Sequence, residues 1–329
     1  MEPLVSICCT AYNHEKYIAQ TLDSFLSQRC DFPFEILIHD DASKDRTADI
    51  IRDYAARYPD VIFPIYQQEN QYCKGFSIDG TFNFPRARGK YIALCEGDDF
   101  WCDPEKLQRQ IAHMEQDPSC TFCFTNGYVH DESGEKPDRA FLPYYEAEKA
   151  MFDGKSRSFS LDEIARINFI PTANFVFRTD ALRGIPRAYM EKRCQHSDLR
   201  MKLFLTAAGH AWYEHVYGCT YRENVSGSAM QIWQKEKRDQ LYVRCQSVVE
   251  MVDDVDTYSR HTASAGLQVV KDHYLWVMAH NAPDLKSLMT GDVGRIWRGL
   301  PLKERLRCSV RLMLPKTLAA KLGKKASRS

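Results

Sequence analysis

Short apolar runs alternate with helical patterns along the first third of the chain, and this rhythm constrains the fold more than any other feature. The runs are typical of strands and lie at Leu4–Cys9, Glu35–His39, Val61–Tyr66 and Tyr91–Cys95. Between them, apolar residues recur at the spacing of amphipathic helices. Strands and helices that alternate in this way indicate a mainly parallel sheet flanked by helices, and hence an α/β fold class.

The fourth apolar run ends abruptly in three carboxylates, Glu96, Asp98 and Asp99. This much negative charge at the end of a buried strand is costly unless a cation or a hydrogen-bonded ligand compensates it. A divalent metal carrying a diphosphate is the natural partner, because hard cations share oxygen ligands with phosphates. Asp103-Pro104 follows as an expected N-cap and first-turn proline, which places the acids in a strand-to-helix loop. A solvated acidic turn is the alternative, but ligands of open α/β sheets bind at this end of the strands.

The first two predicted strands also end in polar loops. The first is followed by Thr10-Ala11-Tyr12-Asn13 and the second by Asp40-Asp41. An aromatic ring and an acid are what a pyrimidine nucleoside requires, namely a stacking face and an acceptor for the ring N–H. Taken singly, Tyr12 could be structural and Asp40 could cap the next helix. Three such loops at one edge of a sheet are the stronger indication of a nucleotide site.

These segments together resemble a known family. Val5-Ser6-Ile7 through Asn13, Asp40 through Asp45, and Gly89 through Trp101 are similar to the inverting glycosyltransferases of family 2. The resemblance covers about the first 230 residues and implies the GT-A fold, with a Rossmann-like, mainly parallel sheet. It implies a domain over 1–230, whose nucleotide-binding half is about 1–130 and whose acceptor half is about 131–230. The chain lacks a dinucleotide-binding Gly-x-Gly-x-x-Gly after the first strand and a phosphate-binding Gly-Lys-Ser/Thr loop.

The resemblance assigns roles to the polar loops. Thr10, Tyr12 and Asp40 match the positions that hold the nucleobase and ribose. Glu96-Gly97-Asp98 matches the Asp-x-Asp motif, with Asp98 as the ligand of Mn2+ or Mg2+ and Asp99 as a neighbour that contacts the donor.

Two further segments match the acceptor half of the family. Cys194 through Leu199 precedes a predicted helix, where the resemblance implies a catalytic base, and Asp198 is the candidate; a plain N-cap is the alternative. Tyr221-Arg222-Glu223-Asn224 resembles the family's Tyr-Arg-x-His segment. Arg222 is then a clamp for the diphosphate, which a guanidinium meets with two parallel hydrogen bonds. Asn224 replaces the histidine, and an amide is a weaker metal ligand than imidazole.

The function implied is transfer of a sugar from a nucleotide-sugar donor, UDP-linked, to a hydroxyl of a glycan or lipid-linked acceptor with inversion, in polysaccharide or lipopolysaccharide biosynthesis. Asn224 and Glu96 leave open a non-catalytic relative that binds a nucleotide sugar or a glycan. A nucleotidyltransferase would need a glycine-rich basic loop after the first strand, which residues 10–14 do not provide.

Composition limits the setting of this activity. Hydrophobic residues make up 44% and charged residues 27%, and the formal net charge is zero, so no overall field points to nucleic acid. The 12 cysteines are scattered, and Cys120-x-x-Cys123 has no second pair at zinc spacing. Free thiols in this number favour a reducing compartment and hence a cytoplasmic location. No signal peptide and no apolar run of about 18 residues is recognised.

The remaining segments carry weaker expectations. Residues from about 135 to 160 show no clear period and are expected to form a long loop or lid. Residues 231–300 are expected to form a helical extension. Residues 301–329 contain nine basic residues and one acid, Glu304. At helical spacing, Leu302, Leu306, Val310 and Met313 lie on the same face. This basic amphipathic tail could lie on an anionic membrane surface, and a solvated tail is the alternative.

Overall fold

The computed structural model describes residues 2–192, 194, 196–225 and 235–313. These residues contain a ten-stranded sheet of order β3-β2-β1-β4-β9-β6-β10-β5, with β7 added at β6 and β8 at β10. The strands are β1 (Val5–Ala11), β2 (Phe34–Asp40), β3 (Ile62–Tyr66), β4 (Tyr91–Leu94), β5 (Phe100–Trp101), β6 (Cys120–Asp131), β7 (Arg139–Ala140), β8 (Arg157–Phe159), β9 (Val176–Arg178) and β10 (His210–Glu223).

The sheet is mainly parallel, as predicted. β3, β2, β1 and β4 pair in parallel, and so do β6 and β10, whereas β9 is antiparallel to both of its neighbours. β3 lies at the edge and pairs with β2 alone. Pro64 is tolerated there because an edge strand can lack one backbone donor.

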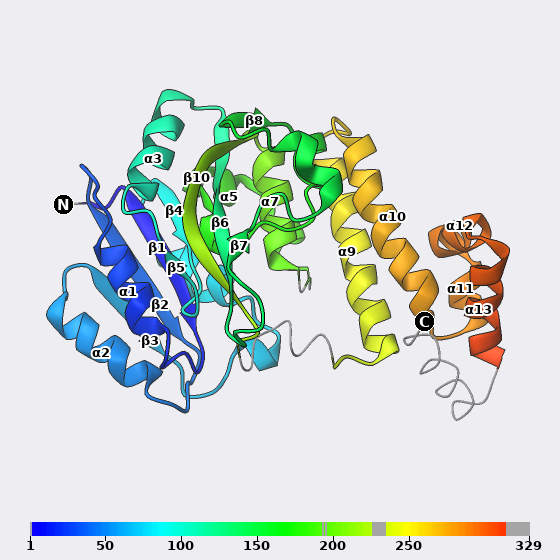
Figure 1. Ribbon diagram of the computed structural model, residues 1–329, viewed down its shortest axis with the longest axis horizontal. Coiled ribbons are helices and arrows are strands. Elements are labelled where there is room, and N and C mark those ends of the chain that lie inside the picture. The colour runs from blue at the N-terminus through cyan, green and yellow to red at the C-terminus, as the bar shows by residue number, and fades with distance from the viewer. Residues whose placement is uncertain (1, 193, 195, 226–234, 314–329) are drawn as a thin grey trace.

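The helices are α1 (Ile18–Leu26), α2 (Thr47–Arg57), α3 (Lys106–Gln116), α4 (Leu161–Arg166), α5 (Thr179–Gly184), α6 (Arg187–Met190), α7 (Ser197–Ala207), α9 (Arg238–Tyr258), α10 (Ser264–Asn281), α11 (Leu285–Met289), α12 (Gly291–Gly299) and α13 (Leu302–Met313). Short 3-10 or π turns lie at η1 (Tyr72–Lys74), η2 (Asp79–Asn83), η3 (Phe84–Arg86), η4 (Glu146–Met151) and η5 (Thr172–Asn174). In Figure 1, α1 and α2 lie in front of the first strands, and α7 lies between the sheet and α9.

Both faces of the sheet are covered. On β1, Ile7 and Cys9 pack in one core with side chains of α1, α2 and α3. Cys8, which points to the opposite face, packs in a second core with side chains of α4 and α7. A strand buried on both faces is rich in apolar residues along its length, which is why β1 was recognisable in the sequence.

Two local predictions differ from the structure. The predicted start of a helix at Asp103-Pro104 is wrong, because α3 begins at Lys106. Asp103 instead accepts a hydrogen bond from the backbone N–H of Glu105 at 2.9 Å and so caps a turn that precedes the helix. The long loop predicted for 135–160 contains β7, η4 and β8, which are too short to leave a periodic signal.

Helices α9 to α13 follow the sheet domain. The antiparallel pair α9 and α10 packs against α4 and α7, and its apolar side chains join the core of the sheet on that side. A separate core unites α9 through α13. Figure 1 shows α11, α12 and α13 at the end of the molecule away from α1 and α2. Residues 226–234 and 314–329 lie outside the described part, so the proposed boundaries at 230 and the final part of the tail stay predictions.

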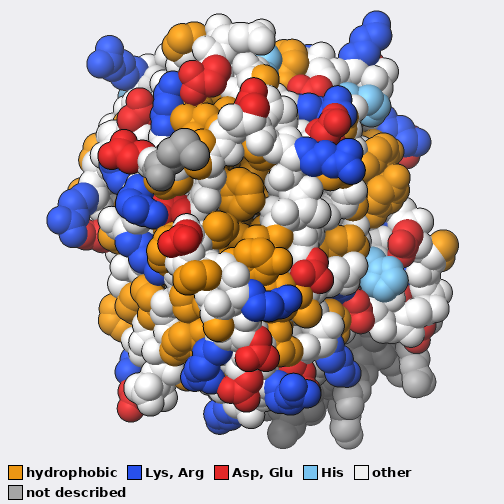
Figure 2. All heavy atoms as spheres, turned by 90° about the vertical axis from the view of Figure 1, so that its left-hand side faces the viewer, with side chains coloured by type: hydrophobic (Ala, Val, Ile, Leu, Met, Phe, Trp, Pro, Cys, Tyr) orange, Lys and Arg blue, Asp and Glu red, His pale blue; other side chains and the backbone are white. Residues whose placement is uncertain are grey.

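The helix lengths, the cysteines and the surface charge bear on where in the cell the protein works. Among the described residues, no helix is long and apolar enough to cross a membrane. All 12 cysteines are free thiols. Figure 2 shows the end of the molecule where α2 lies, with lysines and arginines interspersed with acids around a group of hydrophobic side chains. This mixing agrees with the zero net charge, and neither positive nor negative charge predominates on that face.

Candidate active site

The loops that follow β1, β2 and β4 meet at one edge of the sheet because these strands are parallel and in register. Ala11 pairs with Asp40 at the end of β1 and β2. The backbone N–H of Gly97 donates to the carbonyl of Thr10 at 2.8 Å, which joins the acidic loop to the loop after β1. The structure therefore brings Thr10, Tyr12, Asp40 and the acidic loop together.

Gly97 allows the acidic loop to close on its neighbour. A Cβ atom at this position would lie 3.0 Å from side-chain atoms of Ala11, His14 and Ile18. That is tighter than ordinary van der Waals contact, so a larger residue would push the acidic loop away from β1. Close packing against Ala11, His14 and Ile18 thus explains why a glycine lies between Glu96 and Asp98.

Asp40 keeps an acceptor available at the edge. Its carboxylate is buried, and Oδ2 accepts from the backbone N–H of Ser43 at 3.2 Å. Oδ1 has no hydrogen-bond partner, and burial raises the pKa of Asp40. Asp41 differs, because its two oxygens accept from the backbone N–H groups of Gln71 and Tyr72 at 2.7 and 3.0 Å. Asp40 is therefore the acid of this pair that can meet a ligand.

Backbone strain gathers at the same edge. Asn13, Ala42 and Asn224 have φ values of +59°, +62° and +63° and follow β1, β2 and β10. Asparagine tolerates this left-handed region, but alanine adopts it at a cost of about 1–2 kcal/mol. Strained residues concentrate at functional sites, where the surrounding structure holds them in place.

The three carboxylates of the acidic loop lie in different environments. Glu96 accepts a hydrogen bond from the Thr172 hydroxyl through Oε1, whereas Oε2 is buried without a partner. Burial and the nearby Asp98 raise the pKa of Glu96 to about 7. Asp99 is 2% exposed, and its Oδ1 accepts from the backbone N–H of Arg222 at 2.8 Å. Burial, Asp98 and Glu96 raise the pKa of Asp99.

Asp98 is the carboxylate that faces solvent. Its side chain is 17% exposed, and Oδ2 lies 3.7 Å from Nε2 of His14. His14 Nδ1 is buried without a partner. His14 was not singled out from the sequence, and no local signal would have found it, because only the closure of the two loops brings it to Asp98.

These oxygens fit a hard divalent cation. Asp98 offers an open carboxylate, and Glu96 offers a buried oxygen with no partner. No group of three histidine, cysteine or acidic side chains arranged to hold a metal occurs among the described residues. A cation at Asp98 would therefore take its other ligands from a diphosphate and water, as Mg2+ commonly does.

Arg222 lies beside the acidic loop and is held by protein partners. Its Nε is 2.9 Å from the Glu132 carboxylate, and its terminal nitrogens donate to the Asp98 carbonyl and to Gln20. The guanidinium also lies over the rings of Tyr17 and Phe100, at 4.9 and 4.7 Å. Glu132 was not recognised as a partner from the sequence, because it is far from Arg222 along the chain. A diphosphate would have to replace one of these partners.

Asn224 points to a neighbouring acid. Its side-chain nitrogen donates to Oδ1 of Asp131 at 2.7 Å. This bond, with others from Ser133, lowers the pKa of Asp131. The asparagine at the expected histidine position is therefore part of a hydrogen-bonded turn at the end of β6.

Asp198 lies in the first turn of α7, two residues after the N-cap His196. The N-terminal end of α7 contacts α9, because His196 Nε2 is 2.6 Å from a terminal nitrogen of Arg244. Arg244 in turn pairs with Glu236 at 2.9 Å. Burial lowers the pKa of His196, which the nearby Asp198 opposes. The contact of His196 with Arg244 thus places this end of α7 beside α9.

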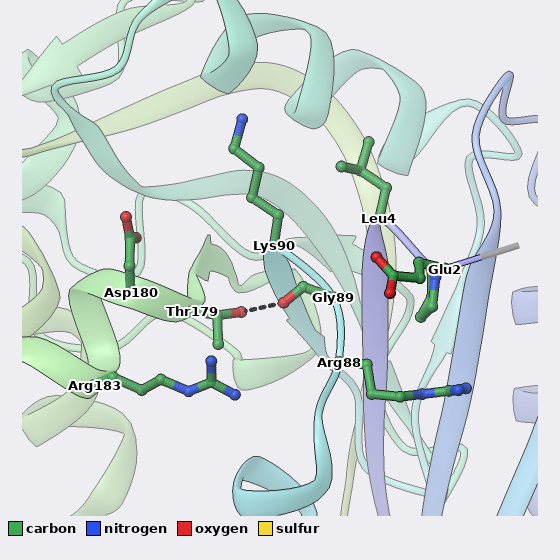
Figure 3. Close-up of a pocket in the computed structure, with 9 residues that line it drawn as sticks. Glu2, Leu4, Arg88, Gly89, Lys90, Thr179, Asp180 and Arg183 are labelled. Carbon is green, nitrogen blue, oxygen red and sulfur yellow. Dashed lines mark hydrogen bonds between the residues drawn. The ribbon is translucent and has the colours of Figure 1, made fainter.

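A separate hollow, at the amino ends of the strands, contains none of these residues. Figure 3 shows Thr179 donating to the carbonyl of Gly89, with Arg88, Lys90 and Arg183 around it. The Thr179–Gly89 bond is 2.7 Å. Arg88 and Lys90 pair with Glu35 and Glu115. Arg183 donates to the carbonyl of Ala87 at 3.0 Å. The hollow lies at the amino ends of β1 and β4.

A mainly parallel sheet with a cluster of acids at the carboxyl ends of its strands is the arrangement expected of the GT-A fold. The family model described as glycosyl transferase family 2 matches residues 6–191, and the chain belongs to this family.

Curated relatives match part of the chain. The Mycobacterium tuberculosis protein Rv1520 is 41% identical over 176 residues, which are 53% of this chain and 46% of the relative. The Escherichia coli protein UDP-Glc:alpha-D-GlcNAc-diphosphoundecaprenol beta-1,3-glucosyltransferase WfaP is 36% identical over 129 residues, 39% of this chain and 48% of the relative. The chain thus spans about half the length of these curated relatives.

Solved structures share the fold. TarS of Staphylococcus aureus in complex with UDP-GlcNAc has a TM-score of 0.56 at 15% identity, over 94% of this chain and 86% of TarS. The mannosyltransferase PcManGT of Pyrobaculum calidifontis, in complex with GDP-Man and Mn2+, has a TM-score of 0.52 at 15% identity, over 94% and 86%. At these identities the likeness confirms the predicted GT-A fold.

Proposed function

We propose that this chain is a glycosyltransferase that moves a sugar from a nucleotide-sugar donor to a hydroxyl of a glycan or lipid-linked acceptor in polysaccharide synthesis. The observation that carries the proposal is the sheet edge where Asp40, Glu96 and Asp98 converge, with one free acceptor on Asp40 and one on Glu96. The family and the acceptor printed in the name of WfaP support it.

The donor is proposed to be UDP-linked. Tyr12 would stack on the base, Asp40 Oδ1 would accept the ring N–H, and Thr10 would lie by the ribose. Glu96 and Asp99 would border the donor. A divalent cation, Mn2+ or Mg2+, held by Asp98 would offset the charge of the diphosphate when bound. Arg222 would exchange Glu132 or Gln20 for a diphosphate oxygen and stabilise the leaving group.

The proposed reaction is a single displacement with inversion. Asp198 would take the proton from the acceptor hydroxyl as its oxygen attacks the anomeric carbon opposite the nucleotide. The C–O bond to the sugar forms while the bond to the diphosphate breaks.

Free thiols and α13, with its exposed apolar stripe and basic residues, support a location at the cytoplasmic face of a membrane.

A non-catalytic relative that binds a nucleotide sugar is the second candidate. The observation that favours it is Asn224, which stands at the position of the family's histidine and is bonded to Asp131. Such a protein would bind donor with metal but would not release nucleotide from it.

Two substitutions separate donor binding from catalysis. Asp98→Ala should abolish metal-dependent donor binding measured by calorimetry, because the open carboxylate is lost. Asp198→Asn should retain donor binding and lower transfer by about 10²–10⁴-fold, the usual contribution of a general base.

Asp239→Asn is a matched control for the second variant, because Asp239 occupies the same first-turn position in α9. It should leave transfer unchanged. Near wild-type transfer by Asp198→Asn would show that another residue is the base, and unchanged donor binding by Asp98→Ala would rule out the proposed metal ligand.

A further inference from the structure

A row of aromatic rings leads away from the acidic loop. Tyr221 on β10 precedes Arg222, whose backbone binds Asp99. The centroid of its ring lies 5.7 Å from that of Phe169 and 6.0 Å from that of Phe141. Burial, and after it the nearby Asp99, Asp98 and Glu96, raise the pKa of Tyr221.

The row continues to the surface through two tyrosines. Tyr144 lies 5.6 Å from Phe141 and 6.1 Å from Phe169, and Tyr145 lies 4.9 Å from Tyr144. Phe141 is 1% exposed, but Tyr144 and Tyr145 are 38% and 54% exposed. We name these five rings the aromatic wall: Tyr221, Phe169, Phe141, Tyr144 and Tyr145. Its outer end presents large rings to solvent, which a protein core does not require.

A buried carboxylate fixes the outer end of the wall. Glu148 is 3% exposed and accepts from the backbone N–H groups of Tyr144, Tyr145 and Asn168 at 2.8, 3.2 and 2.8 Å. It therefore joins the loop that carries the tyrosines to the loop that carries Phe169. The loop with the exposed tyrosines is held by a buried charge, so the rings are pre-organised.

A second anchor comes from β6. Asn126 donates to the carbonyl of Leu142 at 3.0 Å and accepts from the N–H of Leu142 at 2.8 Å. The N–H of Phe141 donates to the carbonyl of Gly127 at 2.7 Å. The segment from Phe141 to Tyr145 is thus fixed along its length. Pre-organisation of this kind reduces the ordering cost of binding a ligand.

We propose that the aromatic wall is an acceptor subsite that takes the C–H face of a pyranose ring. A pyranose has one apolar face of C–H bonds and a rim of hydroxyls, and a tyrosine offers a flat ring together with a polar hydroxyl. Arg139 on β7 and Glu223 on β10 form an ion pair at 2.8 Å that supplies charged groups near the wall for the hydroxyl rim. A lipid tail would favour aliphatic side chains, which the wall lacks.

This inference rests on the proposed function, because only a transferase would use the bound sugar as an acceptor. The wall runs from the edge where the donor is proposed to bind to the surface, so a sugar on the outer tyrosines would belong to the acceptor chain and not to the donor.

The test is saturation-transfer NMR with four methyl pyranosides as probes, namely the glucoside, galactoside, mannoside and N-acetylglucosaminide, each at about 10 mM. At least one probe should receive saturation on the C–H protons of one ring face. Tyr144→Ala and Tyr145→Ala should weaken its binding roughly three- to tenfold, the scale of one aromatic contact. Tyr58→Ala is the matched control, because Tyr58 is 39% exposed at the far end of α2.

Thermal unfolding of each variant shows whether it is folded, and exposed tyrosines should be replaceable without loss of fold. Equal binding in wild type and both wall variants, equal weakening in Tyr58→Ala, or no saturation of any probe would overturn the subsite. Donor hydrolysis without acceptor should not change in the wall variants. If wild type hydrolyses no donor but the probes still contact the wall, the proposed transferase fails and the sugar subsite stands.

Discussion

At the scale of single residues, Lys106 shows how much a buried side chain can depend on its surroundings. Lys106 is 0% exposed, its Nζ donates to Gln110 at 2.9 Å, and it lies 4.4 Å from the centre of the Trp101 ring. Burial lowers the pKa of Lys106 to about 8. The folded chain therefore binds this proton less tightly than the unfolded chain does.

This difference predicts a pH dependence of stability. Between pH 8 and the usual lysine pKa of about 10.4, the unfolded chain carries more protons, so wild type gains stability as pH rises. Lys106→Met lacks this gain. The free energy of unfolding of wild type, relative to that of Lys106→Met, should rise by about 2 kcal/mol between pH 7.5 and pH 10.

Urea unfolding at several pH values measures this change. Lys90→Met is the control, because Lys90 is exposed and pairs with Glu115. Its difference from wild type should vary little with pH. A difference for Lys106→Met that stays constant from pH 7.5 to pH 10 would contradict a depressed pKa.

Residue identities alone predicted some members of the site but not their partners. Asp40, Glu96 and Asp98 were visible because each follows a recognisable strand. His14, Thr172 and Glu132 were not, because each reaches the site through a tertiary contact between distant segments. Whether the predicted residues bind donor remains a prediction.

At the scale of elements, the fully buried strands were the most predictable part of the fold. β1, β2 and β4 are rich in apolar residues and buried along almost their whole length, and the predicted bounds differ from the observed ones by at most two residues. β5 has only two residues, and β7 and β8 pair with longer strands that hold them in place. Such short elements depend on pairing and leave no period in the sequence.

The docking of the extension on the sheet domain depends on one glycine in α10. A Cβ atom at Gly266 would lie 2.4 Å from the carbonyl oxygen of Asp162 on α4. Gly266→Ala should therefore push α10 away from α4, at a cost of about 1–3 kcal/mol that exceeds the gain in helix propensity of about 1 kcal/mol.

Chemical unfolding and limited proteolysis measure this effect. Gly299→Ala is the matched control, because no atom lies within 4 Å of a Cβ built at the end of α12. It should be neutral or slightly stabilising. If Gly266→Ala is as stable and as protease-resistant as wild type, the two helices do not meet as closely as described.

At the scale of the whole molecule, the last described helix, α13, carries an apolar stripe that faces solvent. Leu302, Leu306 and Val310 are 69%, 54% and 44% exposed, and Cys308 on the other face is buried. Lys303 and Arg307 are also exposed. An amphipathic helix of this kind can lie in the interface of an anionic membrane, where each basic residue contributes about 1 kcal/mol.

Binding to liposomes tests this orientation. Leu302→Ser with Leu306→Ser should lower sedimentation with phosphatidylserine liposomes severalfold and leave thermal stability unchanged, because both side chains are exposed. Val243→Ser is the control, since Val243 is 64% exposed on α9. Equal sedimentation of the double variant and wild type would leave α13 with no part in membrane binding.

The sequence predicted that the C-terminal part is helical but not how it is placed. A helical period was recognised in α10, whereas the packing of α9 and α10 on α4 and α7 depends on contacts such as that of Gly266. Helix periodicity shows which face is apolar but not which partner covers it.

The central claim is tested most directly by incubating the protein with a panel of nucleotide sugars and Mn2+ or Mg2+ and measuring the nucleotide released. The account predicts that one donor, a UDP-sugar, is slowly hydrolysed with metal, and that Asp98→Ala abolishes the release while Asp53→Ala on α2 does not. Binding of a donor without release from any member of the panel, with and without glycan acceptors, would contradict a transferase and favour a nucleotide-sugar-binding protein.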